Sequence, residues 1–302
     1  MFKFFENHFG SLLIFFGIIA YFFPFVFSPA KDIAAELLMF SLFLSGLKIK
    51  IEELVHLKQN KGKIVWLSLV YVVFLPLAFY LLTFFLDYHT RLGAFLIVAT
   101  SGAVMSPLLA SFYRLKILWT TAFVVITACM VPFTIPFLVK NLFDANYEVS
   151  MVELCVFLAK MVFVPSLLAF LVRRYFPNFV QKALPFTGGI GSMNMILFLS
   201  VLVSSNQATI SQNLQNHQTL LKLGLMFFVF LSLYLVGYLV PAQDKEEKWT
   251  NCLMFGNMNN GLVVLLSSEF FPPEVMFMTL VSIVPWSFSQ PIFKFVFQKY
   301  FK

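Results

Sequence analysis

Charged residues are scarce in this chain of 302 residues. They make up 12% of it, whereas a soluble domain carries about 25%. Hydrophobic residues make up 60%, and 41 residues are phenylalanine, which would be hard to bury in a water-soluble core. The composition therefore excludes an ordinary soluble domain and predicts an all-α polytopic membrane protein.

Residues that support metal or acid–base chemistry are also few. The three cysteines, Cys129, Cys155 and Cys252, lack metal-ligand spacing and are interpreted as small buried hydrophobes, not as disulfide partners. Histidines and acidic residues fall in loops or at span ends, so we expect no nucleophile, base and orienting carboxylate to converge at one depth. We therefore expect no enzymatic activity and no resident cofactor.

Apolar windows of about 20 residues define the predicted membrane spans. We place ten of them, at residues 9–28, 32–48, 64–86, 92–112, 117–141, 151–172, 184–204, 219–240, 250–270 and 275–297. The second is short, and the fourth and ninth are interrupted. The first lacks a clear cleavage site, so we expect it to remain in the protein as a signal anchor.

Lysine and arginine predict the orientation of these spans. With both termini in the cytoplasm, sixteen of the 21 basic residues fall on the cytoplasmic side. Lys31, Arg91, Lys140 and Lys222 fall outside, and Lys160 falls within a span. This bias predicts a multi-pass protein of the inner (cytoplasmic) membrane with cytoplasmic termini. The membrane surface also accounts for the net charge of +7, so no nucleic-acid partner is expected.

The most informative stretch is Met254–Leu262 (MFGNMNNGL), inside the ninth span. Three asparagines between two glycines are poor helix formers, and unpaired amides are costly in hydrocarbon. Such a stretch is stable at membrane depth only where it is buried in protein or lines a watery cavity, as in the broken helices of carriers. It predicts a binding site at Asn257, Asn259 and Asn260. The alternative is that these asparagines only join helices through hydrogen bonds.

The two halves of the chain mirror one another. Two prolines of the fifth span correspond to two of the tenth, and the pair Ser106–Pro107 falls opposite Asn259–Asn260 at nearly the same offset. Chance could account for one such pair, because proline is common in membrane helices, but several pairs favour a repeat. Five spans in each half give opposite orientations, which predicts inverted repeats over residues 1–145 and 146–302. The polar linker 140–150 is the expected seam.

Four stretches resemble the bile acid:sodium symporter family. Met39 to Leu54 is similar to its second-helix pattern, which contains G-L-x-L-K, and Lys160 to Pro177 is similar to its sixth helix. Gly237–Leu239 followed by Phe255–Leu262 resembles the family's eighth-to-ninth region, and Ser101 to Pro136 aligns without a gap with its P-G-G-T-x-S-N motif and fifth helix. The resemblance covers nearly the whole chain. It implies ten transmembrane helices in inverted five-helix repeats, with discontinuous fourth and ninth helices that cross.

The chain departs from the family at the ligands of the two sodium ions that the resemblance implies. The family's ninth-helix glutamate and glutamine fall on Met254 and Met258, and its third-helix glutamine falls on Tyr71. The fourth-helix asparagine becomes Pro107, and a fifth-helix ligand becomes Val124. Because sodium is a hard cation that prefers several oxygen ligands, we do not expect two-sodium coupling to carry over.

Polar groups that remain at the crossover are the predicted substrate or ion ligands: Ser106, Pro107, Thr120, Asn257, Asn259 and Asn260. The hydroxyls of Ser106 and Thr120 are the remaining candidates for sodium. Lys160 lies about ten residues from the outer edge of its span, roughly 14 Å at 1.5 Å per residue. It either pairs with an anionic substrate or carries a proton, or it extends to the interface along a tilted helix.

Three functions are consistent with these features. The first is a secondary transporter of a small organic anion, a carboxylate or sulfonate, that moves a core made from spans three to five and eight to ten. The second is a proton-linked or facilitative exporter resembling the auxin efflux carriers, which share the fold. The third is a membrane binding or sensing module that does not transport. The expected partners are the anion, Na⁺ or H⁺ as coupling ion, and the lipid bilayer, with the protein as a monomer or homodimer.

Overall fold

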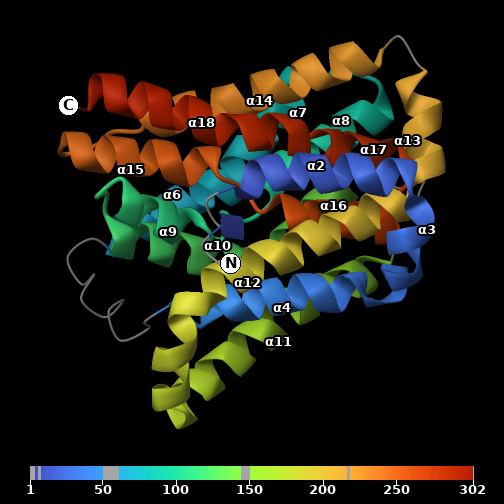
Figure 1. The fold of residues 1–302 in the computed structure, drawn as a ribbon. Coiled ribbons are helices and arrows are strands. Elements are labelled where there is room, and N and C mark those ends of the chain that lie inside the picture. Colours follow the sequence, from blue (N-terminus) through green and yellow to red (C-terminus); the bar gives the residue numbers. More distant parts are fainter. Residues whose placement is uncertain (1–3, 6–7, 50–60, 144–149, 216–217, 302) are drawn as a thin grey trace. The chain divides into compact units, whose positions relative to one another are not determined.

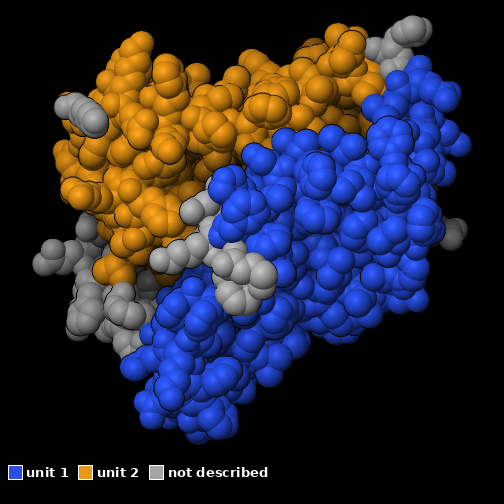
Figure 2. All heavy atoms as spheres, in the orientation of Figure 1, with its two compact units in different colours: residues 1–50, 157–216 blue, residues 51–156, 217–302 orange. Residues whose placement is uncertain are grey.

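The computed structural model describes residues 4–5, 8–49, 61–143, 150–215 and 218–301. Several basic residues assigned to the cytoplasmic side and most of the predicted linker at 140–150 lie outside these ranges. The helices given below belong to the described residues (Figure 1), and so does an isolated β-bridge. The chain divides into two compact units, each made of two separate stretches of sequence: residues 1–50 with 157–216, and residues 51–156 with 217–302 (Figure 2).

Unit 1 is built around one long helix. Its elements are α2 (Phe9–Phe22), α3 (Pro24–Phe27), the 3-10 helix η1 (Ser28–Ile33), α4 (Ala34–Gly46), most of α11 (Met151–Tyr175), α12 (Pro177–Ser205) and α13 (Gln207–Leu214). Helix α12 packs against both α2 and α4. The Asn194 side chain of α12 donates hydrogen bonds to the carbonyl of Leu37 at 2.6 Å and to the hydroxyl of Ser41 at 2.8 Å. These bonds hold an amide within apolar surroundings and fix α12 against α4.

Unit 2 contains both of the interrupted segments. Its elements are α6 (Lys61–Leu69), the π-helical turn η3 (Val70–Phe74), α7 (Leu75–Leu82), α8 (Tyr88–Ala99), α9 (Ser106–Phe112), α10 (Ile117–Leu142), α14 (Thr219–Leu239), α15 (Lys245–Gly256), α16 (Asn260–Phe270), α17 (Pro273–Val281) and α18 (Ile283–Tyr300). They cover predicted spans three to five and eight to ten, the set expected to form the core. Neither unit coincides with a predicted repeat, because each takes residues from both halves of the chain.

Six helical stretches of the described residues are long and apolar enough to span a membrane: Gly62–Leu82, Ile117–Leu142, Met151–Tyr175, Pro177–Ser205, Thr219–Leu239 and Pro273–Tyr300. They match six of the ten predicted spans. A seventh candidate is the pair Phe9–Phe22 and Pro24–Gly46, which is bent by 103°. The protein is therefore a polytopic membrane protein. The first predicted span, placed at 9–28, ends earlier, because the chain bends at Pro24.

The fourth and ninth predicted spans are each split into two short helices, as expected. Helix α8 gives way to α9 across residues 100–105, and α15 gives way to α16 across 257–259. Both split segments begin with an aspartate at the N-cap: the Asp87 carboxylate accepts from the backbone N–H of Thr90 at 3.0 Å, and the Asp244 carboxylate accepts from that of Glu247 at 2.6 Å. These caps satisfy N–H groups that have no partner within the helix.

Glycines allow the closest helix contacts in unit 2. On α14, a Cβ at Gly237 would lie 2.5 Å from the carbonyl oxygen of Asn251 and 2.9 Å from the Cα of Cys252, both on α15. The Tyr234 ring of α14 covers Gly256, the last residue of α15, so closely that a Cβ there would overlap it. The start of the second break is therefore packed directly against α14.

Candidate functional site

The two interrupted segments meet at their breaks. Gly102 and Met258 form an isolated antiparallel β-bridge. The backbone N–H of Ala103 donates to the carbonyl of Asn257 at 3.0 Å, and that of Asn259 donates to the carbonyl of Ser101 at 2.9 Å. We call residues 100–106 and 257–260 the crossing. Backbone groups that leave helical hydrogen bonding in one segment thus find partners in the other, as hydrocarbon surroundings require.

Local sequence accounts for where the second halves of the split helices restart. Pro107 occupies the first turn of α9, where a missing N–H costs nothing and the fixed φ suits a helix. Asn259 is the N-cap of α16, and its side-chain oxygen accepts from the backbone N–H of Leu262 at 3.3 Å. Asparagine and proline therefore end one helix and start another instead of continuing the first.

Several polar side chains at the crossing are buried without a partner in the described chain. These are the hydroxyls of Thr100, Ser101 and Ser106 and both polar atoms of the Asn260 amide, on residues that are at most 4% exposed. A buried polar group without a hydrogen bond costs about 1–3 kcal/mol. Groups of this kind gathered at one place are typical of a binding site, since a bound molecule, ion or water can supply their partners.

The sequence-predicted residues divide between the two units. Five of them lie at the crossing or directly beside it: Ser106, Pro107, Asn257, Asn259 and Asn260. Thr120 lies on α10, fully buried, and its hydroxyl donates to the carbonyl of Lys116 at 2.9 Å. Lys160 belongs to unit 1, on an exposed face of α11, and forms no ion pair with another described residue.

Three further polar residues of unit 2 were not predicted. The hydroxyl of Thr127 accepts from the backbone N–H of Gly102 at 3.1 Å, and Gln290 of α18 donates to the side-chain oxygen of Asn257. Asn251 of α15 is fully buried, and neither of its polar atoms has a partner among the described residues. Asn251 and Gln290 are amides inside apolar spans, so their position in the sequence was an available signal.

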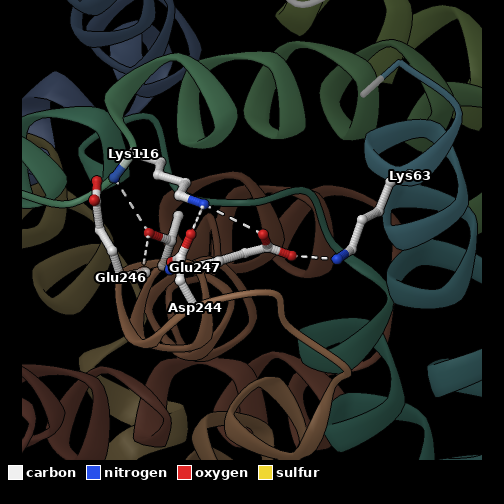
Figure 3. Close-up of polar contacts among 6 residues, drawn as sticks. Lys63, Lys116, Asp244, Glu246 and Glu247 are labelled. Atoms are coloured by element: carbon white, nitrogen blue, oxygen red, sulfur yellow. Dashed lines mark hydrogen bonds and ion pairs between the residues drawn. The ribbon is translucent and has the colours of Figure 1, made fainter. Parts of the chain in front are cut away.

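A cluster of charges joins the starts of three elements of unit 2 (Figure 3). The Glu247 carboxylate is fully buried and pairs with Lys63 of α6 and, at 3.3 Å, with Lys116 at the start of α10. Lys116 also pairs with Asp244 at 2.8 Å, and this hydrogen bond is the main cause of the lowered pKa of the Asp244 carboxyl. Although partial burial opposes it, hydrogen bonding to Asp244 and Glu247 raises the pKa of Lys116. We call these four residues the charge cluster.

An Arg–aromatic group lies where α7 and α10 end and α8 begins. The Arg91 guanidinium lies 3.7 Å from the centre of the Tyr80 ring and donates to the Tyr80 carbonyl at 2.6 Å. The Phe143 ring, which follows α10, lies 5.1 Å from that of Tyr80. A cation stacked on an aromatic face in partly dry surroundings is stabilising, so this contact fixes α8 at its N-terminal end.

Four positions that the resemblance assigns to the family's sodium ligands hold buried residues that are poor in oxygen donors. Tyr71, Met254 and Met258 are fully buried, and Val124 is 2% exposed. The Tyr71 ring contacts the rings of Phe123 and Phe255, with centres 5.0 and 5.4 Å apart. One phenol oxygen and two thioethers do not provide the several oxygens that a hard cation needs. Among the described residues, no three His, Cys, Asp or Glu side chains gather as metal ligands either.

Two split helices that meet at their buried breaks in a polytopic membrane protein are typical of the broken-helix class of membrane carriers. The sequence profile of the sodium bile acid symporter family matches residues 35–213, which is more than half of the chain. The chain therefore belongs to the sodium bile acid symporter family, and it is a secondary transporter, not an enzyme. A comparison with individual curated proteins finds no match.

Proposed function

We propose that this transporter carries a small organic anion, a carboxylate or sulfonate, across the cytoplasmic membrane by alternating access, with the crossing as its binding site. The observation that carries the proposal is the group of buried, unpartnered hydroxyl and amide groups at the crossing. These groups stand where two helices are interrupted, which is where carriers of this class bind their substrates.

The chemistry of the crossing favours an anion. Hydroxyls of Ser101 and Ser106 and the amide of Asn260 can all donate hydrogen bonds. Helix α16 begins at Asn260 and runs for 11 residues, so its N-terminal N–H groups and dipole also favour negative charge. The glutamate position of the family is Met254 here, so no carboxylate from that position repels an anion. Lys160 is proposed to supply a positive charge to the substrate during the transport cycle.

The arrangement in the membrane is proposed to be ten helices in two inverted repeats, residues 1–145 and 146–302, with both termini cytoplasmic. The corresponding aspartate caps of the two split segments support the repeat. Sidedness is supported within unit 2, because the charge cluster joins Lys63 and Lys116, which the basic-residue bias assigns to the cytoplasm, to Asp244, which directly precedes Lys245 of the same side. The protein is proposed to act as a monomer or homodimer, with the lipid bilayer as its further partner.

A second candidate is a proton-linked or facilitative exporter similar to the auxin efflux carriers. Packing of Tyr71, Met254 and Met258 at the positions of the sodium ligands favours it. The two candidates share the crossing as binding site and differ in the coupling ion and the direction of transport.

Binding to the purified full-length protein tests the anion class. Thermal unfolding would be followed with a panel of carboxylates and sulfonates, since a ligand at 100 times its dissociation constant stabilises the folded state by about 2.7 kcal/mol. Stabilising anions would then be radiolabelled and their flux measured in proteoliposomes. A panel without any stabilising anion would contradict the anion class, and binding without flux would indicate a sensing module.

Variants of the crossing test the place of binding. Ser106→Ala and Asn260→Ala are each expected to weaken anion binding by roughly 10- to 150-fold, because one hydrogen bond to a charged group contributes about 1.5–3 kcal/mol. Asn141→Ala is the control, since Asn141 is an exposed amide at the end of α10 that bonds only its own helix. Equal dissociation constants for all three variants and the unsubstituted protein would place the site elsewhere. Transport by Lys160→Ala at the unsubstituted rate would remove Lys160 from the proposal.

A further inference from the structure

Helix α10 packs directly against the break between α8 and α9. A Cβ at Gly102 would lie 3.0 and 3.2 Å from two atoms of the Phe123 ring and 3.4 Å from a methyl carbon of Val124. The Thr127 hydroxyl accepts from the Gly102 N–H at 3.1 Å and donates to the carbonyl of Phe123 at 2.8 Å. One face of α10 therefore holds this break through both ring packing and a hydrogen bond.

Three aromatic rings connect α10 to the other split helix. Tyr71 of η3, Phe123 of α10 and Phe255 of α15 are each fully buried. Their ring centres lie 5.0, 5.4 and 5.9 Å apart, with Tyr71 edge-on to the other two rings and Phe123 stacked on Phe255. Each such pair contributes about 0.5–1.5 kcal/mol beyond the area that it buries. Within the triad, Phe255 is separated from the second break only by Gly256, the last residue of α15.

The second break is also held by a side chain from α18. Gln290 donates to the side-chain oxygen of Asn257, and the amide nitrogen of Asn257 donates to the carbonyl of Leu253 at 3.1 Å. Asn257 is 1% exposed. Its side chain is thus used within the protein, in contrast to that of Asn260, whose polar atoms lack partners among the described residues.

We propose that these side chains form a brace, made of Tyr71, Phe123, Thr127, Phe255 and Gln290, that takes the place of coupling sodium ions at the crossing. The brace rests on the proposed function, because it gives the mode of coupling of the same site. An ion can drive a conformational equilibrium only by as much as its affinity differs between the two states. Because side chains of the protein itself hold the crossing, the affinity for sodium does not differ between the two conformational states. The substrate is therefore carried without sodium.

The residues beside the brace lead to the same conclusion. Met254 and Met258 flank Phe255 and Asn257 on the chain and are fully buried, so their side chains are part of the packed interior. Their thioethers and the single Tyr71 phenol are poor replacements for carboxylate and amide oxygens around a hard cation. The two positions at which the family binds sodium, Met254 and Met258, therefore contribute packing in this protein.

Sodium binding to the full-length protein tests the brace without any knowledge of the substrate. Radioactive sodium binding and thermal unfolding would be measured in sodium, potassium and choline chloride at one ionic strength. No saturable sodium binding and equal melting temperatures in the three salts are expected. Saturable sodium binding by the unsubstituted protein, or stabilisation specific to sodium, would overturn the proposal and would restore Ser106 and Thr120 as ligands.

A variant that places oxygen-bearing side chains at four of the five substituted ligand positions provides the opposite test. The combination Y71Q, V124T, M254E and M258Q is expected to gain saturable sodium binding and sodium-specific stabilisation. A folded variant that gains neither sodium binding nor sodium-specific stabilisation would show that the brace does not occupy the position of a sodium ion. If this variant does not fold, the sodium measurements on the unsubstituted protein still decide the question.

Flux experiments separate failure of this proposal from failure of the proposed function. For any anion carried in proteoliposomes, replacing a sodium gradient by a choline gradient is expected to change the rate by less than about twofold. A fall of about tenfold would overturn the brace and leave anion transport intact. Anion binding that does not depend on Ser106 or Asn260 would instead contradict the site, whatever the response to sodium.

Discussion

Replacing Gly237 by alanine is expected to push α14 away from α15. The new Cβ would lie 2.5 Å from the carbonyl oxygen of Asn251, 2.8 Å from the Cβ of Phe255 and 2.9 Å from the Cα of Cys252. Ordinary contact begins at 3.4 Å, so α14 must move by several tenths of an ångström. Two of the three atoms belong to the backbone and cannot turn aside. Overpacking of this kind costs about 1–3 kcal/mol.

Gly224→Ala, on the same helix, is the matched control. Nothing lies within 4 Å of a Cβ at Gly224. Both substitutions gain the higher helix propensity of alanine, about 1 kcal/mol, so this gain cancels when the variants are compared. The difference in their free energies of unfolding should equal the packing cost at Gly237. Reversible unfolding in mixed micelles measures that difference, and equal stability within about 0.5 kcal/mol would refute the close contact of α14 and α15.

Three further predictions concern hydrogen bonds and charges in unit 2. Thr127→Val should cost about 1–3 kcal/mol because it leaves a buried backbone N–H without an acceptor, whereas Thr121→Val, which removes only a bond within α10, should be nearly neutral in thermal unfolding. Glu247→Gln should destabilise the protein by about 3 kcal/mol through the loss of two ion pairs, and Glu246→Gln on the same turn, where no ion pair forms with a described residue, should not. The pKa of Asp244 is lowered in the folded state, so its contribution to stability is present at neutral pH and lost as pH falls below about 4 through that lowered pKa. Melting temperatures between pH 7 and pH 3 should show this loss, and Asp244→Asn should reduce it.

The sequence identified the second break better than the first. The run around Asn257 and Asn259 combines helix-breaking residues with amides that hydrocarbon does not tolerate, so its composition alone predicted an interruption. Residues 100–105 contain mostly small side chains, which disfavour a helix less strongly as a group. The break there was predicted mainly from the comparison with the second half of the chain. Pro107 gave a local signal because proline is suited to the first turn of a helix.

Contacts between residues far apart on the chain could not be predicted from the sequence. Glu247 is separated from Lys63 by 184 residues and from Lys116 by 131, and no local pattern indicates which basic residue reaches it. The aromatic triad likewise joins three different elements, and the chain contains 41 phenylalanines, most of which gave no sign of their role. The predicted spans were right for the long apolar helices, because span length depends on hydropathy alone.

The interleaving of the two units along the chain determines when the protein can fold during synthesis. Gly102 pairs with Met258, so the partners of the first break are made roughly 8–30 s later at a translation rate of about 5–20 residues per second. During that interval the peptide groups at 101–103 lack their partners from the second break, and such groups are unstable in hydrocarbon. Nascent chains are therefore expected to keep this segment at the headgroup level or within the insertion machinery until α16 has been synthesised. A chain released before residue 257 should be degraded and should not accumulate as a stable half-transporter.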